Sequence, residues 1–229
     1  MRRLATRTRS DHMNGIARLK GTGRIADDLY LLAHDDVTGK PFLQPRALGL
    51  GLAGALLAEL LFAEVIRVNV ERIEVTRQGE PADGLGHHIL GVLRAEPEWH
   101  PLRDWLTFIA GTAVQDVGRR LERAGYLSQV RSRRPWRGTK RVPADSDAAF
   151  APLIRVRAVL YLTEAATVSD AVLTGLATAC GLASRVLLYG QPDARDNVDI
   201  AIRRLHPSLR ELIAQTQAAV DSALLSHRV

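Results

Sequence analysis

The sequence is poor in residues that form crosslinks and metal sites, because its 229 residues include a single cysteine, Cys180. One cysteine excludes an internal disulfide and any zinc site built from several thiolates. Cys180 lies in the apolar segment VLTGLATACGLASRVLL, where a thiol packs as a small hydrophobic side chain. We therefore predict a buried, structural cysteine.

The chain also lacks the short motifs of common catalytic sites, because it contains no GxSxG, HExxH, Walker or dinucleotide-binding pattern. His87 and His88 are adjacent in a segment that we predict as a strand, so their side chains point to opposite faces and cannot share a metal. His34 precedes Asp35 and Asp36, but this segment leads into a turn, where Asp and Gly are expected. We predict no enzyme activity, no metal site and no cofactor.

Long hydrophobic runs are missing as well. The opening segment MRRLATRTRSDHMNGIARLK carries charges without the apolar core of a secretory signal. The longest apolar stretch, Ala47 to Ala58, is interrupted by glycines and followed by Glu59 and Glu64, so it is too short and too charged to span a bilayer. We predict a cytoplasmic protein, and the excess of arginine over lysine, 28 to 3, suggests a GC-rich bacterial genome.

Positive charge is present but unevenly distributed. Residues 1–24 carry seven basic residues against Asp11, and residues 119–141 carry nine against Glu122, so these segments hold +6 and +8. The whole chain carries +6, and the remainder therefore sums to −8. Such local concentration of cations attracts polyanions, either phospholipid headgroups or nucleic acid, although a basic segment that only keeps the protein soluble is the alternative.

The hydrophobic periodicity predicts a mainly α protein: a flexible basic arm at 1–24, then a single compact helical domain at 25–229 with a projecting β-hairpin and a second, short basic β-hairpin. We expect the hairpins at 65–92 and 127–142, and a central, glycine-rich core helix at 45–62. A capping box of Ser208 and Glu211 predicts the start of the last helix. The remaining helices are expected at 25–32, 99–109, 113–127, 152–162, 168–180, 182–189, 193–205 and 209–225.

The basic second hairpin is the candidate binding site. Its arginines surround Trp136, and an indole among cations suits the headgroup region of a membrane. Each cation near an anionic surface contributes about 1 kcal/mol, so a handful is enough for reversible docking. The predicted lipid-binding residues in this segment are Arg119, Arg120, Arg123, Arg131, Arg133, Arg134, Trp136 and Arg137.

Two other interpretations fit the same residues. A helix followed by a basic two-stranded tip is also how a winged helix presents its wing to the phosphates of nucleic acid. Alternatively, the 65–92 hairpin mediates homo-oligomerisation, and the basic segments only keep a scaffold in solution.

The order of the elements resembles the Golgi phosphoprotein 3 family, in particular its shorter bacterial members. The resemblance runs from residue 29 to residue 173 and rests on an ordered set of segments, namely LYLLAHDDVTGK, ALGLGLAGALLAEL, DWLTFIAG, RLERAGYL, KRVPADSD and VRAVLYLTEAATVSDAVL. It implies a helical fold with an oligomerising hairpin and peripheral binding to phosphatidylinositol 4-phosphate. It also implies an adaptor role toward membrane-protein clients, which are Golgi glycosyltransferases in eukaryotic members.

The family's lipid pocket, as the resemblance implies it, uses one tryptophan and three arginines. These positions fall on Gln44, Ala53, Gly111 and Val114, and none carries the family's residue. We therefore expect Arg46 and the arginines of 119–137 to supply a relocated site for anionic lipid, with the protein associated peripherally with the membrane.

Overall fold

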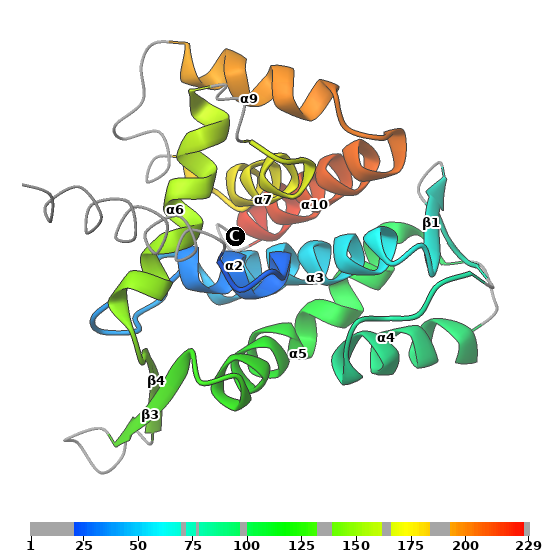
Figure 1. Ribbon diagram of the computed structural model, residues 1–229. Coiled ribbons are helices and arrows are strands. Elements are labelled where there is room, and N and C mark those ends of the chain that lie inside the picture. Colours follow the sequence, from blue (N-terminus) through cyan, green and yellow to red (C-terminus); the bar gives the residue numbers. More distant parts are fainter. Residues whose placement is uncertain are drawn as a thin grey trace, which may run out of the picture.

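A computed structural model describes residues 21–69, 72–76, 78–96, 100–131, 139–161, 166–183 and 193–226. It is a mainly α protein with two small antiparallel β-hairpins, as predicted (Figure 1). The helices are α2 (Ile25–Leu32), α3 (Pro45–Phe62), α4 (Gly84–Ala95), α5 (Leu102–Arg123), α6 (Ser146–Leu160), α7 (Val168–Ala179), α9 (Ala194–Arg203) and α10 (Pro207–Leu225). The strands are β1 (Ile66–Asn69), β2 (Arg72–Val75), β3 (Leu127–Arg131) and β4 (Thr139–Pro143).

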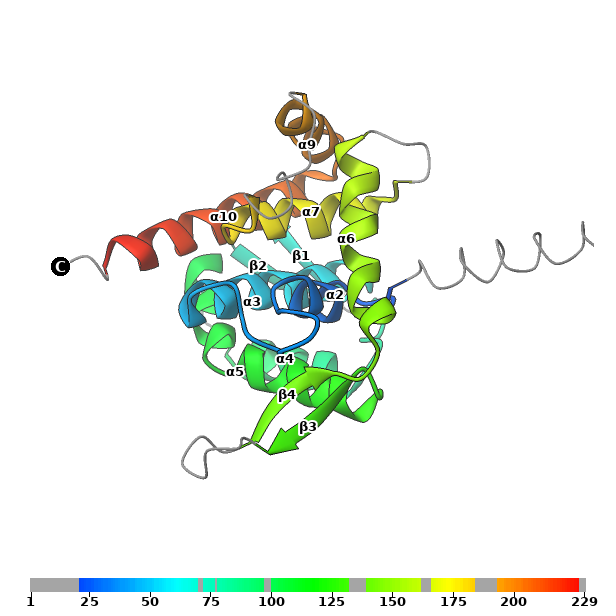
Figure 2. The same cartoon turned by 90° about the vertical axis from the view of Figure 1, so that its left-hand side faces the viewer.

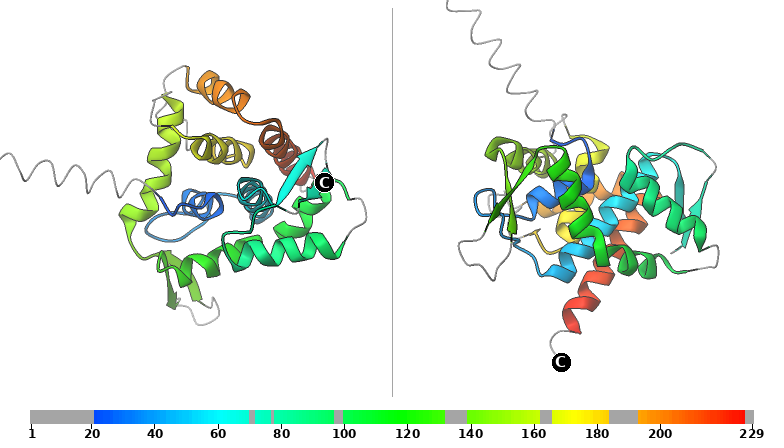
Figure 3. Two further views of the ribbon diagram at one scale, coloured as in Figure 1. Left: turned by 45° about the vertical axis from the view of Figure 1, so that its right-hand side comes forward. Right: turned by 90° about the horizontal axis from the view of Figure 1, so that it is seen from below.

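Helix α3 forms the centre of the core, as its sequence predicts. It packs against α2, α5, α7 and α10, and nearly every residue from Ala47 to Leu60 is buried (Figures 1 and 3). Within the described residues it is the one helix long and apolar enough to cross a membrane, but 72% of that stretch is buried inside the protein. A helix covered on most sides by other helices is a core helix.

The glycines of α3 allow neighbouring groups to approach closely. A Cβ added at Gly49 would lie 2.8 Å from the carbonyl oxygen of Ala110, and one added at Gly54 would lie 2.6 Å from Oγ1 of Thr216. Gly51 faces the buried thiol of Cys180, and a Cβ there would collide with Sγ. The prediction that these glycines and Cys180 serve packing is confirmed.

The two hairpins lie on different sides of the helical body (Figures 1 and 2). In the first, Ile66 pairs with Val75, and Ile66 and Val68 are buried against the body. In the second, Leu127 pairs with Pro143 and Arg131 with Thr139, and the pair projects from the end of α5. Residues 132–138, the predicted basic tip, are outside the described residues.

The segment that contains His87 and His88 is a helix, and its prediction as a strand was wrong. Asp83 caps α4, because its side chain accepts a hydrogen bond of 2.8 Å from the Gly86 N–H. Ile89, Leu90 and Leu93 are buried, at a helical spacing. The first hairpin is therefore limited to residues 66–75 instead of reaching residue 92.

Helix α5 is continuous, although two helices were predicted at 99–109 and 113–127. Its 22 residues bury Leu102, Trp105 and Leu121, and Gly125 follows its end with φ +79°. A glycine in this left-handed conformation is the usual residue just past a helix.

The start of α10 differs from the predicted capping box. His206 is the N-cap residue, and its Nδ1 accepts a hydrogen bond of 3.3 Å from the Ser208 N–H. The Ser208 hydroxyl instead donates to the Val68 carbonyl at 2.7 Å and ties α10 to β1. A capping box does form at the start of α7, between Thr167 and Asp170.

Helices α7 and α9 lie close to their predicted positions. Helix α6 starts at Ser146 rather than at Pro152, which lies inside it. Most of the predicted helix 182–189 is outside the described residues.

Candidate functional site

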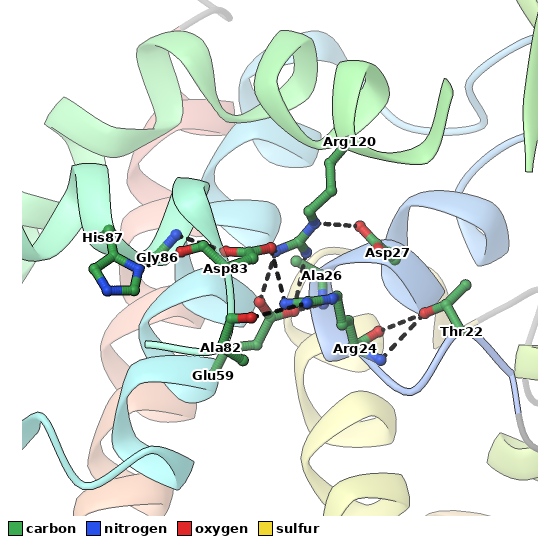
Figure 4. Close-up of polar contacts among 10 residues, drawn as sticks. All are labelled: Thr22, Arg24, Ala26, Asp27, Glu59, Ala82, Asp83, Gly86, His87 and Arg120. Atoms are coloured by element: carbon green, nitrogen blue, oxygen red, sulfur yellow. Dashed lines mark hydrogen bonds and ion pairs between the residues drawn. The ribbon is translucent and has the colours of Figure 1, made fainter. Parts of the chain in front are cut away.

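Arg120, on the last turn of α5, is the centre of an ion-pair cluster rather than part of an outer surface. Its side chain is 12% exposed. Nε donates to Asp27 at 2.8 Å, while Nη1 donates to Glu59 and Asp83, each at 2.9 Å (Figure 4). Arg24 joins the cluster through an ion pair of 2.8 Å with Asp83. The cluster, comprising Arg24, Asp27, Glu59, Asp83 and Arg120, connects α2, α3, α5 and the start of α4.

The cluster contains three carboxylates and two guanidinium groups, so one negative charge is in excess. Burial raises the pKa of Asp27 to about 7, in spite of the opposing effect of Arg120. Burial would also raise the pKa of Asp83, but the Gly86 N–H and Arg120 bind its charged form and hold the pKa below its usual value. The pKa of Arg120 is raised because Glu59 and Asp27 outweigh the effect of burial. Asp27 is therefore the acid of the cluster whose protonation changes near neutral pH.

A second arginine with little exposure, Arg155 on α6, contacts α2 at Asp28. It binds Asp28 and Asp170, and its Nη2 donates to the Ser169 hydroxyl at 3.2 Å. Burial raises the pKa of Asp28, while the N–H of Thr22 lowers it. The adjacent acids Asp27 and Asp28 thus pair with two different arginines, Arg120 and Arg155, and both ion pairs stabilise the packing of α2.

The sequence-predicted cations separate into different environments. Arg120 faces inward, which corrects its assignment to a membrane-facing surface. Arg119 is exposed and pairs with Asp116 at 3.1 Å, and Arg123 is exposed without an ion pair to any described residue. Arg46 is exposed on the first turn of α3. Arg131 lies on β3, whereas Arg133, Arg134, Trp136 and Arg137 are outside the described residues.

A groove of about 540 Å³ opens beside the Arg120 cluster. Arg119 and Arg123 line it from α5, and Asp83 and His88 line it from the side of α4. The groove therefore contains both signs of charge, with Arg123 as its cation without an ion pair among the described residues.

Sequence reasoning missed the loop between α2 and α3, which lies against the second hairpin (Figure 2). Gly39, at φ +64°, packs directly on the Arg141 carbonyl, where any Cβ would collide. The Lys140 ammonium donates to the Thr38 carbonyl at 3.0 Å. Asp35 shapes the loop by accepting from the Thr38 N–H at 2.7 Å. The only signal in the sequence was an apolar residue at each end of a turn, in VTGKPF.

This contact places exposed apolar side chains and cations at one end of the molecule. Val37 is 75% exposed, Phe42 41% and Val130 43%. We call this end the hairpin-end surface and define it by its described residues, Val37, Lys40, Phe42, Arg123, Val130 and Lys140.

The four positions of the family's lipid pocket do not form a cationic site in this chain. Ala53 is fully buried in the core, Gln44 and Gly111 are exposed, and Val114 is partly buried. None of the four side chains is charged, so these positions offer no cation to an anionic ligand.

The histidines do not form a metal site within the described part of the chain, where no group of three or more His, Cys, Asp and Glu residues is arranged to hold an ion. His34 is buried and stacks on Tyr30 with ring centroids 4.0 Å apart, and its Nδ1 lies 2.7 Å from the Tyr30 carbonyl. Burial lowers its pKa, which keeps the ring neutral.

Residues 25–224 match the family model of Golgi phosphoprotein 3 (GPP34), and the chain belongs to this family. The match covers every described helix and strand apart from the final residue of α10. No curated protein matches the chain at a significant level.

Proposed function

We propose that the protein is a peripheral membrane adaptor that binds anionic phospholipid headgroups, phosphatidylinositol 4-phosphate among them, through the hairpin-end surface. The observation that carries this proposal is the meeting of the α2–α3 loop and the second hairpin. Val37, Phe42 and Val130 are exposed there beside Lys40 and Lys140. Family membership supports the same kind of role.

The composition of this surface suits the boundary between lipid headgroups and acyl chains. Cations are attracted to anionic headgroups, each by about 1 kcal/mol, and exposed apolar side chains gain when they leave water. The basic residues Arg133, Arg134 and Arg137, with Trp136, follow directly in the sequence of the same hairpin. Reversible docking by several weak contacts is the expected mode.

Charge supplies this binding instead of a pocket shaped for one headgroup. The family's pocket positions lack cations here, and Arg120 is already neutralised inside the protein. We therefore expect affinity to follow the anionic charge of the membrane, so phosphatidylinositol 4-phosphate and phosphatidylserine should support similar binding when their total charge is matched.

Vesicle co-sedimentation tests the proposal. Wild-type protein should bind vesicles containing phosphatidylserine or phosphatidylinositol 4-phosphate, should bind pure phosphatidylcholine poorly, and should lose binding as salt rises. The double variant Arg123→Glu with Lys140→Glu, and separately the triple reversal of Arg133, Arg134 and Arg137, should weaken binding at least about tenfold. Arg195→Glu, an exposed residue of α9 away from this surface, is the matched control and should bind as wild type does.

The same hairpin carries the competing interpretation, nucleic-acid binding. The double variant Val37→Ser with Phe42→Ser, made in the wild-type protein, distinguishes the two interpretations. Loss of these apolar side chains should weaken vesicle binding but leave electrostatic binding to a DNA duplex unchanged. Binding that ignores anionic lipid content rejects the membrane proposal. Tight, salt-sensitive binding to the duplex without binding to vesicles would favour the alternative.

A further inference from the structure

A second groove lies between the end of α3, strand β1 and the junction of α9 with α10. It has a volume of about 560 Å³, and an adjoining hollow of about 180 Å³ shares Val168, Arg204 and Leu205 with it. Figure 1 shows β1 and the α9–α10 junction on the right, whereas the second hairpin is at the lower left. This α3–α10 groove is therefore separate from both the hairpin-end surface and the Arg120 cluster.

The groove has an apolar lining that the fold leaves open. Phe62 is 45% exposed and Val168 is 55% exposed, and Leu205 and Leu209 form the wall beneath them. Exposed apolar side chains that cluster around a hollow mark a binding surface more often than a random patch does. The space accommodates side chains of a peptide rather than a single ion.

Among the described residues that line the groove, arginines outnumber carboxylates. Arg67 and Arg204 line it, and neither has an ion pair with any described residue. Glu64 is the one carboxylate among the lining residues, and His206 lies on the same rim. In contrast to Arg120, these two arginines keep their charge available for a ligand.

We propose that the α3–α10 groove binds an acidic segment of a partner protein, one in which Asp or Glu alternates with large apolar side chains. The apolar side chains would fill the hollow beside Phe62 and Val168, while the carboxylates would pair with Arg67 and Arg204. Charge complementarity is the basis for choosing this occupant. Such a site would give the adaptor its protein ligand, so the inference extends the proposed function.

The chain's own basic segments are poor occupants. Residues 1–20 carry six Lys and Arg against Asp11, and the tip at 132–138 carries three arginines without an acid, so the cationic rim repels both. A membrane is also a poor occupant, because a protein docked by the hairpin-end surface holds this groove away from the bilayer (Figure 1). A segment of a separate protein is the occupant that we propose, and the groove would face the solution that contains it.

Peptide display on the full-length protein tests the inference with random sequences, so no partner has to be chosen beforehand. Random 12-residue peptides are selected for binding to wild-type protein, and peptides that also bind the double variant Arg67→Glu with Arg204→Glu are discarded. The enriched peptides should be acidic and rich in Leu, Ile or Phe. In fluorescence anisotropy the best peptide should bind wild type at least about tenfold more tightly than the charge-reversed variant.

Two controls make the outcome decisive. The first is Arg94→Glu, on the exposed end of α4, which should bind the selected peptide as wild type does. The second uses the double variant Arg67→Glu with Arg204→Glu, which should retain the circular dichroism spectrum and the vesicle binding of wild type. No enrichment, enrichment of basic peptides, or equal binding by the variant overturns the inference. Loss of vesicle binding in this variant would assign the groove to lipid, whereas failure of vesicle binding by wild type itself would reject the proposed function and leave the peptide result standing.

Discussion

At the scale of single residues, the arginines of α5 show how position determines the role of a charge. Arg120 and Arg123 are three residues apart on one helix, but Arg120 meets three carboxylates and Arg123 is exposed. The partners of Arg120 are Asp27, Glu59 and Asp83, which lie 93, 61 and 37 residues away in the sequence. Of these two arginines, Arg123 alone is available to an outer surface.

Arg120→Met should destabilise the fold by about 3–5 kcal/mol, because it leaves the buried carboxylates without their common partner. The free energy of unfolding in urea at pH 7 measures this loss. Arg123→Met is the matched control and should change stability by less than about 0.5 kcal/mol. Equal effects of the two substitutions would show that the cluster does not hold the helices together.

Asp27 should make stability depend on pH. Its pKa is 3.8 in the unfolded reference and about 7 in the folded protein, so between these values the folded state binds more protons than the unfolded state. The free energy of unfolding then falls as pH rises through this window, by at most about 1.4 kcal/mol per pH unit from this group. Below about pH 4 both states hold the proton, and the contribution is constant.

Asp27→Asn removes this titration, so the stability of wild type relative to the variant should decrease steadily from about pH 4 to about pH 7. Urea unfolding at several pH values provides the comparison. Asp221→Asn, an exposed residue of α10 outside the cluster, should keep the wild-type profile. Parallel curves for wild type and Asp27→Asn would mean that Asp27 does not bind the extra proton.

At the scale of secondary-structure elements, α3 and α4 show what local pattern can and cannot decide. The apolar glycine-rich run of α3 predicted a core helix correctly, because a helix apolar on nearly all sides must be covered. The run HHILGVL of α4 fits either a strand or a helix by composition. The Asp83 cap and the burial of Ile89 and Leu93 against the body select the helix.

Gly51→Ala should destabilise the protein by about 1–3 kcal/mol, because the added methyl group collides with the buried Cys180 thiol. Gly111→Ala is the matched control in another helix, where nothing lies within 4 Å of an added Cβ. That substitution should stabilise the protein by up to about 1 kcal/mol, since alanine favours the helix. Thermal unfolding of both variants measures the difference, and a stabilised Gly51→Ala variant would contradict the packing at this site.

At the scale of the whole molecule, the two proposed binding surfaces lie at different ends of the helical body. The second hairpin carries the hairpin-end surface, and the α3–α10 groove opens near the first hairpin (Figures 1 and 3). This separation would allow lipid and protein to bind together, which is what an adaptor requires. The groove also adjoins β1, so the predicted self-association through the first hairpin would compete with it, and mass in solution would reveal this.

Simultaneous binding predicts that a groove-selected peptide co-sediments with anionic vesicles only when the protein is present. The double variant Arg123→Glu with Lys140→Glu should leave the peptide and the protein together in the supernatant, whereas the double variant Arg67→Glu with Arg204→Glu should sediment without the peptide. Arg195→Glu should behave as wild type does. Displacement of the peptide by vesicles would show that the surfaces overlap, contrary to this arrangement.

The sequence by itself determined the helical class, the core helix, the two-stranded basic hairpin and the packing role of Cys180. These features depend on local periodicity, on turn residues and on the apolar character of a single segment, all of which can be read within about 20 residues.

Only the tertiary structure decided which charges neutralise one another and which remain exposed. Arg120 and Arg123 are equivalent in the sequence pattern, and Val37 carries no sign that it lies beside the second hairpin, because both outcomes depend on segments distant along the chain. The energy of a charge depends on its surroundings in three dimensions, so burial and the approach of remote carboxylates separate internal ion pairs from binding surfaces.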